Sequence, residues 1–127
     1  MSHKLLFICA AVVLLVYGLI WLVIPAFGLG LSGHTVAVHD LASIIARYWG
    51  SAFIGVAVLL WLARNGQADS IAVRAIVMGG LVLAVTGLVA GIIDPVFGDP
   101  NAMIWVTIVL YALFSVWFAL IAFKKPA

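Results

Sequence analysis

The amino-acid sequence predicts an all-α integral membrane protein, a four-helix bundle with both termini in the cytoplasm, and three observations lead to this fold class. Hydrophobic residues make up 68% of the 127 residues and charged residues 8%, whereas an ordinary soluble domain has roughly 45–50% and about 25%. Four apolar runs are each long enough to cross a bilayer. The few basic residues lie mostly beside the ends of these runs, on one side of the predicted bundle.

The four spans form one predicted domain over residues 1–127, because the chain is too short for more. The first span covers about residues 5–24 and ends at Pro25, since a proline ring interrupts a helix. Its length exceeds the apolar region of a typical signal peptide, so we interpret it as a span. A glycine-containing connection follows, and we expect it to lie at the membrane interface. The remaining spans are predicted at about residues 41–62, 71–93 and 102–123.

Two polar turns separate the last three spans. In the first, residues 64–70, both Asp69 and Ser70 are candidate N-caps, because their side-chain oxygens accept hydrogen bonds from the free N–H groups at a helix start. The second, residues 94–101, contains two prolines and a glycine. We therefore expect the third span to end at about Ile93.

The distribution of Lys and Arg sets the predicted orientation. One side carries the N-terminus, the second connection, the C-terminus and five basic residues, Lys4, Arg64, Arg74, Lys124 and Lys125. The opposite side has no basic residue nearer than Arg47. Because short cytoplasmic loops are enriched in Lys and Arg, both termini are predicted to be cytoplasmic.

Arg47 lies well inside a predicted span, whereas Arg74 lies in the first turn of its span, and a cation at membrane depth is a candidate functional residue. At about 1.5 Å per residue it lies roughly 25 Å above Arg64, near the outer boundary of a hydrocarbon core about 30 Å thick. Asp94 lies at nearly the same height. Two structural interpretations therefore compete with ligand binding. Arg47 either extends to the outer headgroups or forms an ion pair with Asp94 or with Asp40, two turns earlier on its own helix face.

A polar stripe favours the ligand-binding interpretation, because small and polar stripes in membrane helices face other helices. It lies along the second predicted helix, which we expect to begin before the membrane. Its members are Asp40, Ser43, Arg47, Ser51 and Gly55.

Four hydroxyl-bearing residues also fall at one predicted height, about 18–20 Å above the cytoplasmic edge. If their side chains point inward, they line an outward-facing pocket below Arg47 for a lipid headgroup or a small anionic ligand. The alternative is four unrelated hydrogen bonds, in which Ser and Thr bond their own helix backbone. The ligand-binding candidates are Arg47, Ser51, Tyr17, Thr86 and Tyr111.

Small residues on the third span indicate close helix packing. Gly80, Ala84, Gly87 and Gly91 lie on one face, and the last two form a G-x-x-x-G pair that lets helix backbones approach closely. This face packs either another helix of the bundle or a helix of a partner.

The spans lack the residues of common membrane chemistry. No predicted span contains His, Glu or Asp, so proton relays, metal ligands and haem ligands are missing there. Cys9 is the single cysteine and has no activating cation in its own span. We therefore predict no enzyme activity, no cofactor and no metal. The metal-ligating residue types gather on the outer side, in a spacing that matches no recognised site: His34, His39, Asp40, Asp94, Asp99 and Met103.

A further pattern runs through nearly the whole chain. The matching residues are Lys4, Pro25, Ile45-Ala46-Arg47, Gly50, Gly55 and Trp61-Leu62-Ala63-Arg64. With them the chain resembles a widespread group of uncharacterised small bacterial membrane proteins with four spans, loosely similar to DoxX-like proteins. The group has leucine where this chain has Ile45, and the turn at residues 94–101 is not typical of it. The resemblance implies the four-span fold and the bacterial inner membrane, and it supplies no activity.

These observations favour a non-catalytic accessory or scaffolding subunit of a larger inner-membrane complex. The alternative is a small binding or transport protein with the outward-facing pocket near Arg47. The expected partners are the lipid bilayer and either other membrane subunits or further copies of this chain. A nucleic-acid partner is not expected, because the basic character of the chain comes from very few charges, six basic residues against four Asp.

Overall fold

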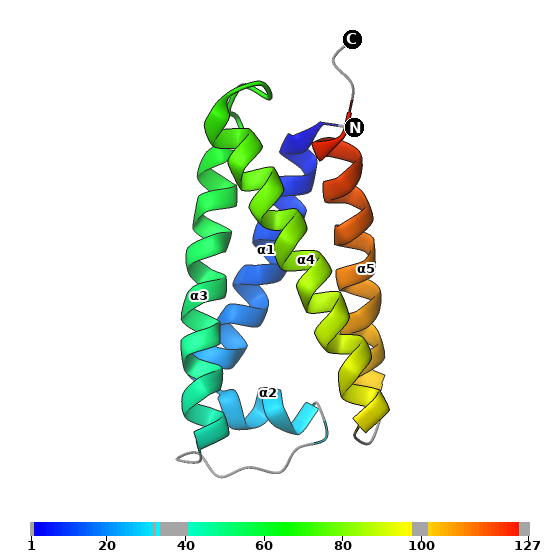
Figure 1. The fold of residues 1–127 in the computed structure, drawn as a ribbon. Coiled ribbons are helices and arrows are strands. Elements are labelled where there is room, and N and C mark those ends of the chain that lie inside the picture. Colours follow the sequence, from blue (N-terminus) through cyan, green and yellow to red (C-terminus); the bar gives the residue numbers. More distant parts are fainter. Residues whose placement is uncertain (1, 32, 34–40, 98–101, 125–127) are drawn as a thin grey trace. The chain divides into compact units, whose positions relative to one another are not determined.

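The structure is a computed structural model that describes residues 2–31, 33, 41–97 and 102–124, with the backbone alone described at residues 94–97. Within these ranges the chain is all-α (Figure 1). Its five helices are α1 (His3–Val23), α2 (Pro25–Leu31), α3 (Leu41–Ala63), α4 (Ile71–Phe97) and α5 (Ala102–Ala122).

Four of these helices are long and apolar enough to cross a membrane. The candidate spans are α1, α3, residues Ile71–Ile93 of α4, and α5. A helix satisfies its own backbone hydrogen bonds, so apolar helices of this length are suited to a lipid environment. The chain is therefore a multi-pass membrane protein in contact with lipid.

The connection after Pro25, predicted as a glycine-containing segment at the membrane interface, is helical over its first part. Pro25 suits the first position of a helix, because the N–H that it lacks would have no partner there. The carbonyl of Ile24 accepts hydrogen bonds from the N–H groups of Phe27 at 3.0 Å and Gly28 at 3.1 Å. Beyond α2, Gly33 has a φ of 84°, a left-handed conformation that glycine adopts at little cost. Proline thus ends α1 and begins α2.

The helix α4 also continues past Ile93, where the sequence predicted a turn. It ends at Phe97, two residues after Pro95. A proline in a helix removes one backbone hydrogen bond and crowds the preceding turn. The helix continues for only two residues beyond this proline.

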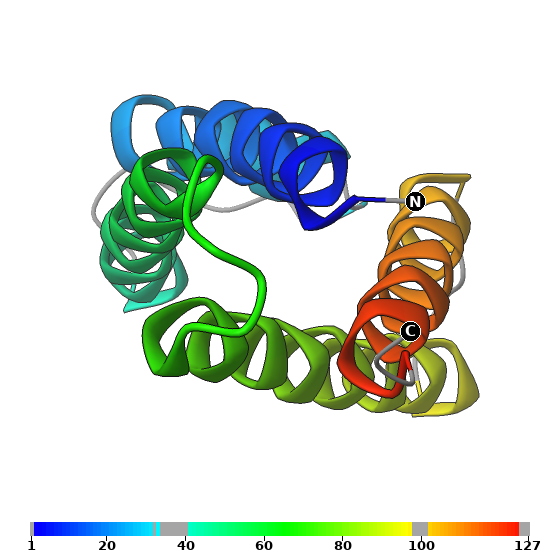
Figure 2. The ribbon, with the colours of Figure 1, turned by 90° about the horizontal axis from the view of Figure 1, so that it is seen from above.

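Residues 1–127 divide into two compact units. The first consists of Ile8–Leu62, with most of α1, α2 and most of α3, and is called the α1/α3 unit. The second consists of Met1–Phe7 and Ala63–Ala127, and is called the α4/α5 unit. In Figure 2 the neighbouring helices α4 and α5 of the second unit are seen from above.

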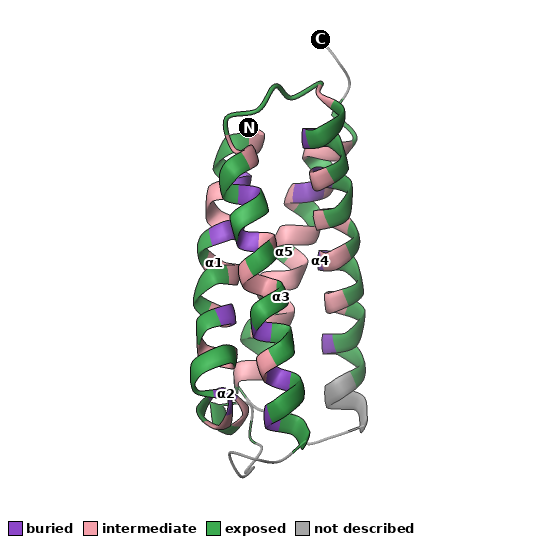
Figure 3. Cartoon of the chain, turned by 90° about the vertical axis from the view of Figure 1, so that its left-hand side faces the viewer, coloured by how far each residue is buried: buried purple, intermediate pink, exposed green. Residues whose placement is uncertain are grey.

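Much of each long helix is exposed, and the buried residues form separate bands along the ribbons (Figure 3). The exposed side chains include large apolar ones, such as Val23 at 67% and Leu62 at 72%. In a soluble protein such exposure would favour aggregation. In a chain with four candidate spans, it supplies the surface that lipid or a partner helix covers.

Candidate functional site

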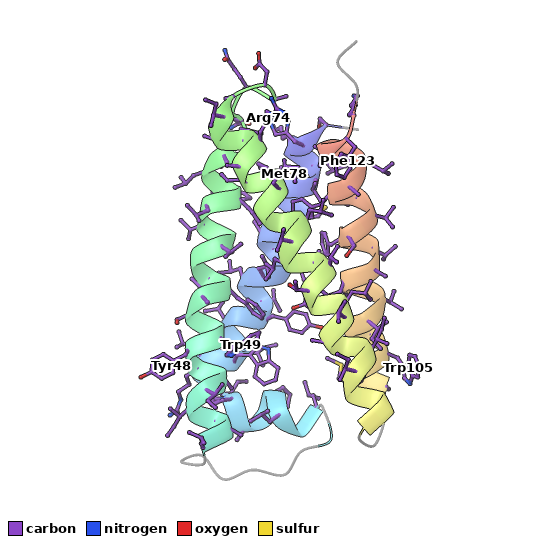
Figure 4. All side chains as sticks on the ribbon, in the orientation of Figure 1. Tyr48, Trp49, Arg74, Met78, Trp105 and Phe123 are labelled. Atoms are coloured by element: carbon purple, nitrogen blue, oxygen red, sulfur yellow. The ribbon has the colours of Figure 1, made fainter. Side chains whose placement is uncertain are left out.

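Arg47 lies in the second turn of α3 and is half-buried. The two residues that follow it are strongly exposed, Tyr48 at 72% and Trp49 at 59%. The ring of Trp49 meets the ring of Phe53 edge to face, with 6.2 Å between centroids. Figure 4 shows Tyr48 pointing away from α3. A cation beside exposed Tyr and Trp near a helix end is typical of the membrane-water interface, where the amphipathic rings face the headgroups.

The two carboxylates predicted to pair with Arg47 lie outside the described part of the structure. Asp40 precedes α3 among the residues that are not described, and Asp94 is described only by its backbone. The ion pair therefore stays a prediction.

Two of the hydroxyls predicted to line the pocket donate hydrogen bonds to backbone carbonyls of their own helices. Ser51 Oγ donates a hydrogen bond to the carbonyl of Tyr48 at 2.7 Å. Thr86 Oγ1 donates to the carbonyls of Val82 and Leu83, at 2.8 and 3.2 Å. Both residues are exposed. For Ser51 and Thr86 the structure therefore shows the local hydrogen bonding that was the alternative to an inward-facing pocket.

The remaining pocket candidates are half-buried and belong to different units. Tyr17 lies in the α1/α3 unit, together with Arg47 and Ser51. Tyr111 lies in the α4/α5 unit with Thr86, and its ring packs over Gly87. The Tyr111 ring is thus part of a helix contact within its own unit.

The residues of the stripe predicted along α3 do not share one buried face within this chain. Ser43 is fully buried, but Ser51 and Gly55 are exposed, and nothing lies within 4 Å of a Cβ placed on Gly55. The hydroxyl of Ser51 is satisfied locally, so it gives the helix no reason to turn that face inward. The buried face of α3 instead follows the smaller side chains, with Leu60 at its end: Ser43, Ala46, Gly50, Ala57 and Leu60.

A close crossing of α1 and α3 was missed in the sequence. A Cβ on Gly50 would lie 2.6 Å from the carbonyl oxygen of Gly18 and 2.7 Å from the backbone nitrogen of Leu22. A Cβ on Gly18 would lie 2.8 Å from the carbonyl oxygen of Gly50. Each glycine therefore presents the hydrogen that replaces its Cβ to the other's carbonyl, as in the Cα–H···O contacts of closely packed helices. The available signal was the lone glycine of the first apolar run.

The glycines of α4 face large side chains of α5. A Cβ on Gly80 would collide with the ring of Phe118, and one on Gly87 with the ring of Tyr111. A Cβ on Gly91 would lie 3.2 Å from Ile108 Cγ1. Ala84, predicted on the same face, is buried. The glycines thus form hollows that side chains of α5 fill.

The polar turn between α3 and α4 is hydrogen-bonded to the first turn of α1. His3 Nε2 lies 3.0 Å from the carbonyl oxygen of Gly66, and the His3 ring meets Phe7 edge to face with 5.5 Å between centroids. Of the two predicted N-caps, Ser70 takes the role, because its Oγ accepts a hydrogen bond from the N–H of Val73 at 3.3 Å. Nothing in the sequence pattern indicated the part played by His3.

The indole nitrogen of Trp117 in α5 differs from the polar atoms described above because it is buried without a hydrogen-bond partner among the described residues. The Trp117 indole stacks on Phe114, with ring centroids 6.4 Å apart and planes 7° apart. A buried indole N–H without an acceptor is unfavourable, so the aromatic stacking and the surrounding apolar contacts must offset its cost.

Met103 is the one predicted outer metal ligand whose side chain is described. The side chains of the others lie outside the described part of the structure: His34, His39, Asp40, Asp94 and Asp99. Among the described side chains, no three or more His, Cys, Asp or Glu residues gather into a group that could hold a metal ion.

No protein-family model, no curated protein and no solved structure matches the chain. The structure shows four candidate membrane spans.

Proposed function

We propose that this protein is a non-catalytic accessory or scaffolding subunit of a larger complex in the bacterial inner membrane, with both termini in the cytoplasm. The observation that carries the proposal is a second face of small residues on α4, which the chain leaves exposed. Its small members are Ala72, Ala75, Gly79, Thr86 and Ala90, and the larger exposed side chains of Val82 and Ile93 lie along its edge.

This second face is distinct from the face that packs against α5. At about 100° per residue, it lies roughly a third of a turn from Gly80, Gly87 and Gly91. Nothing lies within 4 Å of a Cβ placed on Gly79. Lipid chains have no need for small residues, whereas helices in membranes use them to approach one another closely. The exposed small face therefore suits a helix of another subunit or of a second copy of this chain.

The proposed orientation rests on the basic residues of the α4/α5 unit. This unit holds Lys4, Arg64, Arg74 and Lys124, all at or next to helix ends. Figure 1 shows the first turn of α1, the turn before α4 and the end of α5 at one end of this unit. The enrichment of Lys and Arg in short cytoplasmic segments supports a cytoplasmic location for that end.

The test is copurification from membranes in a mild detergent, comparing the native chain with a variant carrying Ala75→Leu and Gly79→Leu. The proposal expects a reproducible partner with the native chain and its loss with the variant, because two leucines fill the small face. The variant chain stays folded, since Gly79 has free space around it and leucine is the better helix former.

The matched control is Val85→Leu, on an exposed position of α4 away from the small face. It is expected to keep the partner. The absence of any reproducible partner for the native chain, or a partner that survives the double substitution, would contradict the proposal.

A second candidate function is the binding or transport of a lipid headgroup or small anion by Arg47. The half-buried position of Arg47 beside the exposed Tyr48 and Trp49 favours it. Under this function, Arg47→Leu abolishes binding of the anion while the protein stays folded, and Arg47→Lys keeps part of the binding. Unchanged binding by the Arg47→Leu variant would remove this candidate.

A further inference from the structure

Three segments that are distant in the sequence each place an exposed cation at the same end of the α4/α5 unit. Lys4 lies in the first turn of α1, Arg74 in the first turn of α4, and Lys124 just beyond α5. We call them the basic end. Figure 1 shows that the segments carrying them lie at the same end of this unit. The one acidic side chain described in this unit is that of Asp69.

Specific contacts bring the three segments to this end. The bond between His3 Nε2 and the Gly66 carbonyl holds the first turn of α1 to the turn before α4. Ser70 caps α4 one turn before Arg74, whose N–H donates to the Ser70 carbonyl at 3.0 Å. The ring of Phe118, which packs over Gly80, holds α5 against α4. The basic end is thus assembled by the fold.

Each cation has a large exposed apolar side chain beside it. Leu5, next to Lys4, is 53% exposed; Ile71, one turn before Arg74, is 88% exposed; and Phe123, next to Lys124, is 71% exposed. Met78 continues the exposed apolar surface one turn beyond Arg74 (Figure 4). A positive charge at a membrane edge, beside exposed apolar side chains, matches the two parts of a lipid molecule.

We propose that the basic end is a binding surface for phospholipids with a net negative headgroup. The cations attract the headgroup phosphate, whose negative charge no cation of the headgroup neutralises, and the adjoining apolar side chains contact the acyl chains. An acidic protein segment would complement the charges and would leave the apolar side chains without a partner of their own kind. Juxtamembrane Lys and Arg residues favour anionic lipids by an electrostatic attraction that salt screens.

The test measures binding of individual lipids to the purified full-length protein by native mass spectrometry. The two probes are phosphatidylglycerol and phosphatidylcholine with the same acyl chains. The native chain is expected to prefer phosphatidylglycerol, more strongly at low salt. The variants are Lys4→Gln, Arg74→Gln and Lys124→Gln, singly and combined. Phosphatidylglycerol binding is expected to fall about fivefold for each cation removed and roughly a hundredfold for the triple variant.

The matched control exchanges the cations and keeps the charge, with Lys4→Arg, Arg74→Lys and Lys124→Arg. It is expected to retain the preference. The single variants keep the remaining basic residues, so each tests the proposal even if the triple variant inserts poorly. A third probe, soluble glycerol phosphate, separates a lipid site from a site for free phosphate.

Three results would overturn the proposal. The first is equal binding of the two lipids by the native chain. The second is an undiminished preference for phosphatidylglycerol in the glutamine variants. The third is displacement of the lipid by glycerol phosphate at equal concentration. Copurification of an acidic protein that the triple variant loses, without any lipid preference, would assign the basic end to a protein partner instead.

Discussion

The two units of this protein use glycine in different ways. In the α1/α3 unit, Gly18 and Gly50 bring backbone against backbone, so each faces the other's carbonyl. In the α4/α5 unit, Gly80 and Gly87 form hollows that receive the rings of Phe118 and Tyr111. The same residue type therefore supports a contact between two main chains in one unit and between a main chain and a side chain in the other.

Whether a glycine faces a backbone or a ring determines how well its contact tolerates a substitution. A ring can rotate or be replaced by a smaller side chain, whereas a backbone atom moves only with its whole helix. Interiors tolerate changes of volume where neighbouring side chains can repack. The α1/α3 crossing should therefore be intolerant of any side chain at its glycines, and the α4/α5 contact should accept compensating substitutions.

The largest expected effect comes from Gly50→Ala. The new methyl group would overlap the Gly18 carbonyl and the Leu22 nitrogen, so the helices must separate, at a cost of about 3 kcal/mol in the free energy of unfolding. Unfolding in mixed micelles with increasing sodium dodecyl sulfate measures it. The matched control is Gly55→Ala on the same helix, where a Cβ meets nothing within 4 Å. It is expected to be neutral or stabilising by up to about 1 kcal/mol. Equal stability of the two variants would show that no close crossing exists.

The next effect sharpens the contrast through compensation. Gly80→Ala is expected to cost about 1–2 kcal/mol, because its methyl group displaces the ring of Phe118. In a double-mutant cycle with Phe118→Leu, part of this cost should return, as a coupling of about 1 kcal/mol. The corresponding cycle of Gly50→Ala with Leu22→Ala should show little coupling, since the obstructing atom of Leu22 is its backbone nitrogen. Similar coupling in both cycles would contradict the distinction between the units.

A smaller effect tests the attachment of the chain's first turn to the α4/α5 unit. His3→Ala removes the hydrogen bond to Gly66 and the edge-to-face contact with Phe7, and is expected to cost about 1 kcal/mol. Amide hydrogen exchange in the turn at residues 64–70 should also become faster. His3→Phe keeps an aromatic ring and removes the donor, so it separates the two contributions. Unchanged exchange in both variants would show that the turn is ordered without His3.

The smallest effects are expected at the exposed hydroxyls, which contribute to neither glycine contact. Ser51→Ala and Thr86→Val each remove a hydrogen bond to the residue's own helix, so the change in unfolding free energy should stay below about 0.5 kcal/mol. A loss above 1 kcal/mol for either variant would indicate that its hydroxyl bonds another partner in the membrane, and would revive the pocket below Arg47.

The number and approximate positions of the long helices were predicted from the sequence, because they depend on hydrophobicity along the chain. Four apolar runs led to four long helices, because a helix in lipid must satisfy its own backbone and therefore follows the apolar length directly. The short α2 was missed, since a seven-residue segment with two glycines has little intrinsic helix propensity. Its hydrogen bonds to the Ile24 carbonyl depend on the preceding helix rather than on its own composition.

The candidate site was less predictable, because polarity and packing select different faces of a helix. The polar stripe of α3 pointed to Ser51 and Gly55, whereas the buried face contains Ala46 and Gly50. A serine in a membrane helix can bond the backbone of its own helix, so its hydroxyl does not require that face of the helix to point inward. A glycine reveals its role only when its neighbour is known, and Gly18 lies 32 residues before Gly50 in the sequence.

The bond between His3 and Gly66 has a consequence for the order of assembly during synthesis. The two residues are 63 positions apart, so the first turn emerges from the ribosome long before its partner exists. It can be fastened only after α1, α2 and α3 have been made and the following turn has reached the same side of the membrane. The first turn of α1 can therefore reach its final position only after the middle of the chain has been synthesised.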